Sequence, residues 1–138
     1  LTDYLFSWEK MLSFQGNTAP YLQNAYVRIR SIFRKAAAEG ICTEAAPIVI
    51  TDPAERTLAL QILKFGEVLH AALEDQRPNL LCLYLYELAD SFHRFYEACP
   101  ILKSEGEMRS SRLALADVTA KVLKTGLGLL GIGVPERM

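Results

Sequence analysis

Apolar residues recur with helical spacing along most of the chain, and the clearest case lies between Pro78 and Pro100. Steps of three and four residues, the spacing of one helical face, separate Leu81, Leu85, Leu88, Phe92, Phe95 and Cys99. Pro78 suits the first turn of a helix, where its missing N–H is not needed. Pro100 marks the other end, because the residue before a proline is pushed out of the α region. Since such a helix is too apolar to stand alone, we predict that it is the central helix of a bundle.

Two further apolar stripes precede this stretch and predict long helices. The first follows Thr18, whose hydroxyl is expected to cap it, and ends where Gly40 adopts a left-handed conformation. The second begins at the capping pattern Asp52–Glu55. Its inward face is expected to consist of Leu58, Ile62, Phe65, Leu69 and Leu73. Gly66 in the middle of this helix suggests close packing against a neighbour, because glycine otherwise costs a helix about 1 kcal/mol relative to alanine.

A third stripe follows the central helix. It begins at a second capping pattern, Ser104–Glu107, and runs to about Thr125. The residues expected to face inward are Leu113, Ala116, Ala120 and Leu123. Together the stripes predict an all-α fold, a helical bundle of about five helices that includes a short leading one.

The segments outside these long helices are short. Near the start, Tyr4, Leu5, Trp8 and Leu12 lie close to one face of a short amphipathic segment. Residues 47–50 read Pro-Ile-Val-Ile, a strand-like composition without a partner run, which we interpret as a buried loop. The chain ends in a glycine-rich tail from 126 to 138.

Composition limits the class of protein. A chain of 138 residues, 51% of them hydrophobic, can bury the core of one domain. No apolar run approaches the roughly 18 residues of a membrane span, and a net charge of −1 leaves only local patches for nucleic acid. The odd set Cys42, Cys82 and Cys99 lacks a CxxC pair and indicates reduced, mostly buried thiols in a cytoplasmic protein. The opening LTDYLF resembles neither a signal peptide nor an initiator, so we expect a piece of a longer protein.

Motifs of catalysis are weak here. Gly126-x-Gly128-x-x-Gly131 matches the dinucleotide fingerprint, but it follows a predicted helix instead of a strand, so we interpret it as a helix cap and turn. Neither His70 nor His93 has partners at a metal-binding spacing. We therefore expect no catalytic residue, cofactor or metal in this chain.

Two features leave a binding role open. The first long helix carries Arg28, Arg30, Arg34 and Lys35 off its apolar stripe. They form either a solvated face or a contact for phosphates. Tyr96 lies at the edge of the central apolar stripe, where it either completes the core or contacts a ligand.

Three blocks of sequence carry a more specific signal. They are DY at 3–4 with GNTAPYLQ at 16–23 and the residues up to Ile32; YLYELA at 84–89 with Phe92, Phe95 and Tyr96; and the last stretch, from Arg112 to the terminal PERM. Together these blocks resemble the carboxyl-terminal part of arginyl-tRNA synthetase, a class I enzyme. The resemblance covers nearly the whole chain, and GNTAPYLQ and the terminal ERM are its most specific parts.

The resemblance implies a domain organisation and a function. Residues 1–17 would join from the catalytic domain, and 18–138 would be the helical anticodon-binding domain. The domain would recognise the anticodon loop of arginine tRNA so that the catalytic domain of the same chain attaches arginine. ATP and Mg²⁺ would belong to that catalytic domain, because the HIGH-like and KMSK-like signatures are absent here. The competing hypothesis is a stand-alone helical scaffold that binds a protein partner.

The resemblance also implies site residues. Tyr96 and Met138 would contact an anticodon base, with the glycine-rich tail folding back to place Met138 beside Tyr96. Arg137, together with Arg94 and Arg109, would hold phosphates. The family usually has tyrosine where this chain has Asn24, so a contact made by that tyrosine is in question.

Overall fold

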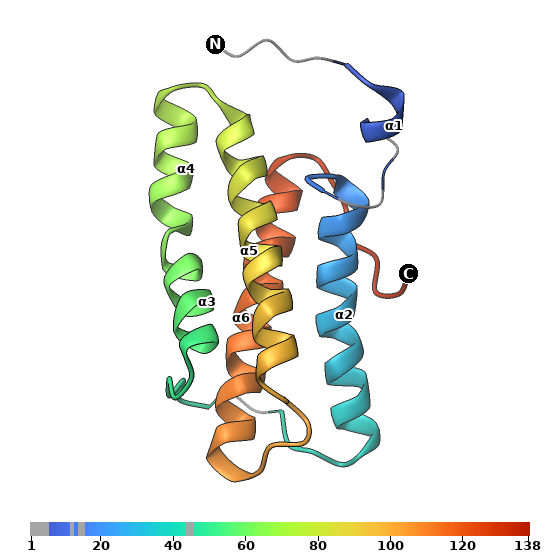
Figure 1. Ribbon diagram of the computed structural model, residues 1–138, viewed down its shortest axis with the longest axis vertical. Helices are drawn as coiled ribbons and strands as arrows, with labels where there is room; N and C mark the ends of the chain where they lie inside the picture. Colours follow the sequence, from blue (N-terminus) through green and yellow to red (C-terminus); the bar gives the residue numbers. More distant parts are fainter. Residues whose placement is uncertain (1–5, 12, 14–15, 44–45) are drawn as a thin grey trace.

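The computed structural model is a bundle of helices (Figure 1). It describes residues 6–11, 13, 16–43 and 46–138. The helices in these residues are α1 (Trp8–Met11), α2 (Ala19–Ala38), α3 (Pro53–Leu63), α4 (Phe65–Glu74), α5 (Pro78–Ala98) and α6 (Gly106–Leu129). Since only Lys64 separates α3 from α4, the described residues form four long helical rods and the short α1. The all-α prediction is confirmed, and the helix number is near the predicted five.

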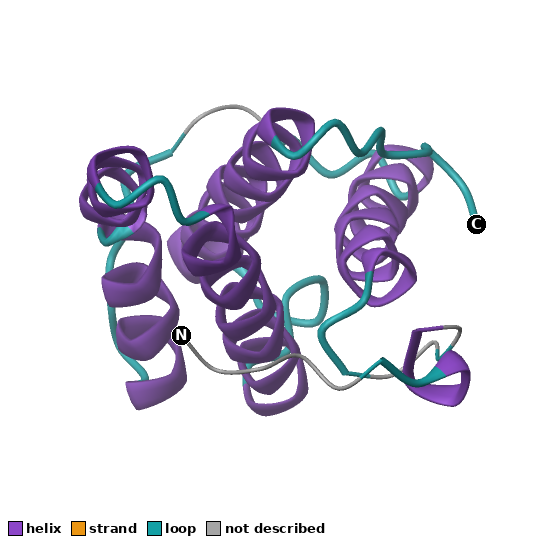
Figure 2. Ribbon diagram, turned by 90° about the horizontal axis from the view of Figure 1, so that it is seen from above, coloured by secondary structure: helices purple, strands orange, loops and turns teal. Residues whose placement is uncertain are grey.

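Helix α5 is the centre of the bundle, as predicted. It contacts α2, α3, α4 and α6, and the view from above shows neighbours on several sides of it (Figure 2). All six residues of its predicted stripe are buried. The helix begins at Pro78 and gives way to extended backbone at Cys99, where φ is −117° and ψ is 97°. The two prolines therefore set its limits.

Close packing joins α6 to α5. The predicted inward residues Leu113, Ala116, Ala120 and Leu123 are all buried. At Gly126 an added Cβ would lie 2.6 Å from a methyl carbon of Leu85, so the two helices approach too closely for a side chain. The helix continues to Leu129, beyond the predicted end at Thr125, and Gly131 with φ of +75° follows it in the left-handed region.

Two of the predicted helix caps are wrong. Thr18 makes no side-chain capping bond, and its buried hydroxyl has no hydrogen-bond partner in the described residues. Pro20 has no backbone N–H, so the first turn lacks one of the N–H groups from which a capping side chain accepts a hydrogen bond. Ser104 is not a cap either: helix α6 is preceded by Glu105, and the Ser104 hydroxyl donates to the carbonyl of Pro100. The capping box of Asp52 with Glu55 is confirmed.

The second predicted helix is interrupted at Lys64, and not all of its predicted inward residues are in the core. Leu58 is buried, and Ile62, Phe65 and Leu69 pack against the core, as predicted. Leu73 is 77% exposed, so its prediction as a core residue is wrong. Leu73 lies one residue before the end of α4, beyond the part of the helix that packs against the core. Gly66 is exposed with open space at its Cβ position, so the prediction of close packing there is also wrong.

The connecting segments are more exposed than predicted. The segment at 47–50 is non-helical, but Ile48, Val49 and Ile50 are 40–56% exposed, so it is not a buried loop. The N–H of Val49 donates to the Ser111 hydroxyl at 2.8 Å, and that hydroxyl donates to the Val49 carbonyl at 3.0 Å, so the segment is attached to α6. Trp8 in α1 is exposed; the other three apolar positions of that predicted face lie outside the described residues.

No helix in the described ranges is long and apolar enough to cross a bilayer.

Candidate functional site

The carboxyl-terminal tail, residues 131–138, folds back against α2. After the turn at Gly131, Ile132 and Val134 pack against the hydrophobic core. The side-chain amide of Gln23 donates to the carbonyl of Gly133 over 2.7 Å. Figure 1 shows the tail passing α2 before it ends. The tail is thus attached by both apolar packing and polar contacts.

Glu136 makes most of the polar contacts between the tail and α2. Its carboxylate accepts hydrogen bonds from the Tyr26 hydroxyl at 3.3 Å and from the Arg30 guanidinium at 3.1 Å. Its carbonyl accepts from Arg34 at 2.8 Å. The hydrogen bond from Arg30 lowers the pKa of the Glu136 carboxyl below its usual value and outweighs the opposing effect of desolvation. These contacts fix the position of the residues that follow Glu136.

Tyr96 lies at the edge of the core on α5, with 37% of its surface exposed. Its ring stacks on Phe92, with centroids 6.1 Å apart and planes inclined by 27°. The guanidinium carbon of Arg28 lies 5.7 Å from the Tyr96 centroid, within the range of a cation–π contact. These contacts hold the ring in place while part of Tyr96 stays exposed at the surface.

His93 helps to hold Arg28 in place. Its Nδ1 lies 3.3 Å from a terminal nitrogen of Arg28. Burial, and then the nearby Arg28, lower the pKa of His93. Because arginine can only donate, a neutral His93 accepts this hydrogen bond through Nδ1. Arg28 is therefore positioned by a partner that carries no charge at neutral pH.

A groove of about 580 Å³, here called the tail groove, lies between α2, α5 and the tail. Its lining residues are Asn24, Val27, Arg28, Ser31, Arg34, Tyr96, Arg137 and Met138. It combines an aromatic ring, a thioether, an amide with donor and acceptor, and three arginines. Such a surface suits a planar, polar and anionic ligand.

The structure brings three of the five predicted site residues together. Tyr96, Arg137 and Met138 line the tail groove. Arg94 is exposed and pairs with Asp90 at 2.9 Å, one turn before it on α5, and it does not line the groove. Arg109, near the start of α6, donates to the carbonyl of Ser104 and also lies outside the groove. The role of all five in RNA binding stays a prediction.

Sequence reasoning did not place Glu136 or Asn24 in the site. The available signal was the spacing on α2: Gln23, Tyr26, Arg30 and Arg34 recur at steps of three and four and share one face. In the structure Arg30 and Arg34 bind the tail through Glu136, a partner that the sequence analysis did not include among its alternatives for these residues.

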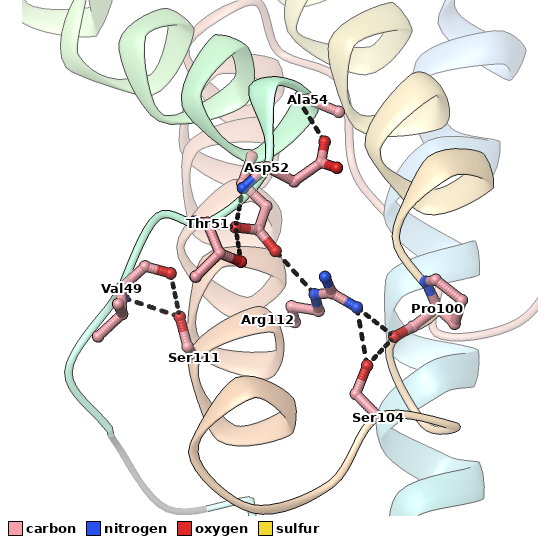
Figure 3. A network of polar contacts seen from close by, with 9 residues as sticks. Val49, Thr51, Asp52, Ala54, Pro100, Ser104, Ser111 and Arg112 are labelled. Atoms are coloured by element: carbon pink, nitrogen blue, oxygen red, sulfur yellow. Dashed lines mark hydrogen bonds and ion pairs between the residues drawn. The ribbon is translucent and has the colours of Figure 1, made fainter.

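A second polar network fixes the loop that follows α5 (Figure 3). Arg112 of α6 is buried and donates to Glu55 at 2.7 Å, to the carbonyl of Pro100 at 2.9 Å and to the hydroxyl of Ser104 at 2.7 Å. Burial alone would raise the pKa of Glu55, but hydrogen bonds from Thr51 and Arg112 outweigh it and lower that pKa. The network ties α3, α6 and residues 100–104 into one rigid unit.

No constellation for metal binding or thiol chemistry appears in the part of the chain that is described. No group of three His, Cys, Asp or Glu side chains there could hold a metal ion. Cys42, Cys82 and Cys99 are free thiols, and burial raises the pKa of Cys99 to about 11.

Comparisons with known proteins agree on one family. The model of the DALR anticodon binding domain matches residues 22–138. The chain is similar to the arginine–tRNA ligase of Chromobacterium violaceum, 57% identical over 138 residues, or 100% of this chain and 24% of that protein. The corresponding protein of Laribacter hongkongensis is 56% identical over 99% of this chain and 23% of its own length. The chain thus spans about a quarter of these curated relatives.

Solved structures give the same result. Arginyl-tRNA synthetase from Thermus thermophilus superposes with a TM-score of 0.83 at 40% identity, covering 92% of this chain and 22% of that one. The enzyme from Plasmodium falciparum gives a TM-score of 0.86 at 36% identity, covering 99% of this chain and 24% of that one.

Proposed function

The chain belongs to the DALR anticodon binding domain family, and from this premise we propose that it binds the anticodon loop of arginine tRNA as part of an arginine–tRNA ligase. The relatives that share more than half of its residues carry that enzyme's name. The proposed reaction of the whole protein is the ATP-dependent attachment of arginine to its tRNA, through an arginyl-adenylate. ATP and Mg²⁺ would serve the catalytic domain, and this chain would supply tRNA recognition.

The tail groove has the chemistry that reading a single-stranded base requires. All arginine codons share a middle G, so arginine anticodons share a middle C. Bases of RNA loops are typically stacked on aromatic side chains and hydrogen-bonded on their pairing edges. Tyr96 offers the stacking surface, and Met138 can pack against the opposite side of a base. Asn24 lines the same groove and carries both a donor and an acceptor for a pairing edge.

The observation that carries the proposal is the meeting of Tyr96 and Met138 in one groove. Glu136, the tail residue bonded to α2, lies two positions before Met138. Arg137 would contact a phosphate beside the base. Arg94 would exchange its exposed contact with Asp90 for a phosphate at little cost, because surface ion pairs contribute about 0–1 kcal/mol. Arg109 would contact a more distant phosphate.

The proposal extends to the organisation of the whole protein. Residues 1–17 would join the catalytic domain to the anticodon-binding domain at 18–138. The whole protein would act in the cytoplasm, where free thiols such as the exposed Cys42 stay reduced.

A fluorescence titration of the chain tests the proposal. One arm uses arginine tRNA, and the other uses the same tRNA with its middle anticodon base changed. We expect the changed tRNA to bind about tenfold more weakly, because a wrong base still stacks on Tyr96 but leaves edge hydrogen bonds unmade, at a cost of about 1.4 kcal/mol. Equal affinity for both tRNAs would show that the chain does not read this base. Absence of salt-dependent tRNA binding would favour the protein-scaffold hypothesis.

A further inference from the structure

A second groove, here called the loop groove, shares Arg28, Ser31 and Tyr96 with the tail groove. The tail groove extends along α2 toward Asn24, whereas the loop groove extends the other way, toward Glu39. Its outer wall is the segment from Pro100 to Lys103. Tyr96 and Arg28 thus lie where two adjoining grooves meet.

The loop groove is positively charged. Arg28, Lys35 and Lys103 line it, and Glu39 is the carboxylate among its lining residues. Lys35 and Lys103 are exposed. Within the described ranges no carboxylate lies within ion-pair distance of either lysine. Both ammonium groups are therefore available to an anionic ligand.

The base of the loop groove is apolar. Ile32 and Ile101 are buried beneath it, and Leu102 is partly buried. The ring of Tyr96 forms one of its sides. Its volume of about 520 Å³ falls within the range of roughly 300–1,000 Å³ of small-ligand sites. An apolar base with cations around it suits a ligand that is both flat and anionic.

The wall of this groove is anchored at both ends by hydrogen bonds to Arg112. Arg112, itself bonded to buried Glu55, holds the carbonyl of Pro100 and the hydroxyl of Ser104 (Figure 3). Lys103 lies between these two anchored residues. A cation on a fixed segment loses less conformational freedom on binding than one on a flexible loop.

We propose that the loop groove binds the nucleotide adjacent to the base in the tail groove. Lys35 and Lys103 would contact its phosphate, and its base would lie against the apolar surface beside Tyr96. This inference rests on the proposed function. A nucleotide fits better than an acidic peptide, because Tyr96 and the Arg28 guanidinium present flat faces and the groove adjoins a proposed base site. Phosphate contacts position an RNA without reading its sequence.

The test uses Lys35→Ala, Lys103→Ala and the double variant. Lys64→Ala is the matched control, because Lys64 is exposed at the junction of α3 and α4, outside both grooves. Affinity is measured over a range of salt concentrations for arginine tRNA and for the tRNA with the changed middle base. Each groove variant should weaken binding to both tRNAs equally, on the order of fivefold. The slope of log K against log salt should lose about 0.7 per lysine, and K64A should change neither quantity.

Charge-preserving variants separate a phosphate contact from a folding effect. Lys35→Arg with Lys103→Arg should restore both the affinity and the salt slope. If the double alanine variant keeps wild-type affinity and slope, the inference is wrong, even where the wild-type chain distinguishes the two tRNAs. Polyglutamate is the probe for an acidic peptide. If the double alanine variant still binds tRNA but no longer binds polyglutamate, the groove takes an acidic peptide and the inference is also wrong. If the wild-type chain binds both tRNAs with equal affinity, the proposed function is contradicted instead.

Discussion

At the scale of single residues, Tyr96 is where the proposed base reading is most open to test. Tyr96→Ala removes the ring that stacks on Phe92 and lies beside Arg28. Stacking on an aromatic contributes about 1–3 kcal/mol per base, so arginine tRNA should bind roughly 5- to 150-fold more weakly. Tyr96→Phe keeps the stacking surface and should bind nearly as the wild type does. A Y96A chain that is unchanged in both urea stability and tRNA affinity would exclude Tyr96 from the site.

Glu136 is the residue whose loss should free the tail. The chain has three methionines, Met11, Met108 and Met138, so methyl-labelled methionine gives one NMR signal for the end of the tail. Glu136→Ala removes the carboxylate that accepts from Tyr26 and Arg30 and leaves only the bond from Arg34 to the backbone carbonyl, so the Met138 signal should sharpen and move toward its position in an unfolded peptide. The Met108 signal should not move. Glu67→Ala, at an exposed carboxylate on α4, is the control and should leave all three signals unchanged.

The same signal should report pH. Because Arg30 lowers the pKa of the Glu136 carboxyl, the tail contact is present above the ordinary glutamate value of about 4.3 and is lost only as pH falls through the lowered value. A titration of the Met138 signal should therefore have its midpoint below that of an exposed glutamate. A midpoint at or above the ordinary value would contradict the assigned contact with Arg30.

At the scale of helices, two glycines in α6 provide a matched pair. Gly126→Ala would place a Cβ 2.6 Å from a methyl of the fully buried Leu85, and such overpacking typically costs about 1–3 kcal/mol. Gly128→Ala meets nothing within 4 Å and should stabilise the helix by up to about 1 kcal/mol. Urea unfolding should therefore show opposite signs for the two variants. Equal effects would mean that α5 and α6 are not in close contact at Gly126.

The helices that the sequence predicted best are those whose ends are set by local chemistry. Helix α5 lies between Pro78 and Pro100, and the capping box at Asp52 begins α3 where predicted. The break at Lys64 was not predictable, since no proline or glycine stands at that position and the apolar spacing continues across it. Tertiary contacts decided the role of the Ser104 hydroxyl, which accepts from Arg112 and donates to the carbonyl of Pro100 instead of capping α6.

The site was predictable only in part, and for a related reason. The placement of Tyr96 beside Met138 followed from family resemblance, because nothing in the helical spacing relates α5 to the chain end. The grooves depend on contacts between segments distant in sequence, such as Arg30 with Glu136. Each of these residues alone has the pattern of an exposed surface charge. Only the fold shows that they are partners.

The buried pair of Arg112 and Glu55 joins three helical ends, and its loss should be costly. Arg112→Met leaves Glu55 as an uncompensated charge at 2% exposure, which typically costs about 3–5 kcal/mol. Arg94→Met, at an exposed pair with Asp90, is the control and should cost no more than about 1 kcal/mol. Free energies of unfolding from urea titrations measure both.

Lowering the pH should reduce the difference in the free energy of unfolding between the wild type and R112M. The lowered pKa of Glu55 means that its stabilising contribution is present above the unfolded pKa and is lost as pH falls through the folded value. In R112M the carboxyl loses its guanidinium partner, so its pKa rises and protonation relieves the unpaired charge. The wild type should therefore lose more stability than R112M as pH falls below the ordinary glutamate value of about 4.3. A constant difference as pH falls below that value would show that the pair is not ionised in the fold.

At the scale of the whole molecule, the net charge of −1 offers no long-range attraction to RNA. Binding must then depend on cations gathered on one side. The residues lining the two grooves include five cations: Arg28, Arg34, Lys35, Lys103 and Arg137.

If three to five of them contact phosphates, log K should fall with log salt at a slope between about −2 and −4, since each contact with a single strand contributes about −0.7. Lys64→Glu, outside the grooves, should leave this slope unchanged. A slope near zero would mean that these cations do not contact phosphates. A slope steeper than about −7 would require contacts by cations all around the bundle, and the two grooves would then not be the tRNA-binding surface.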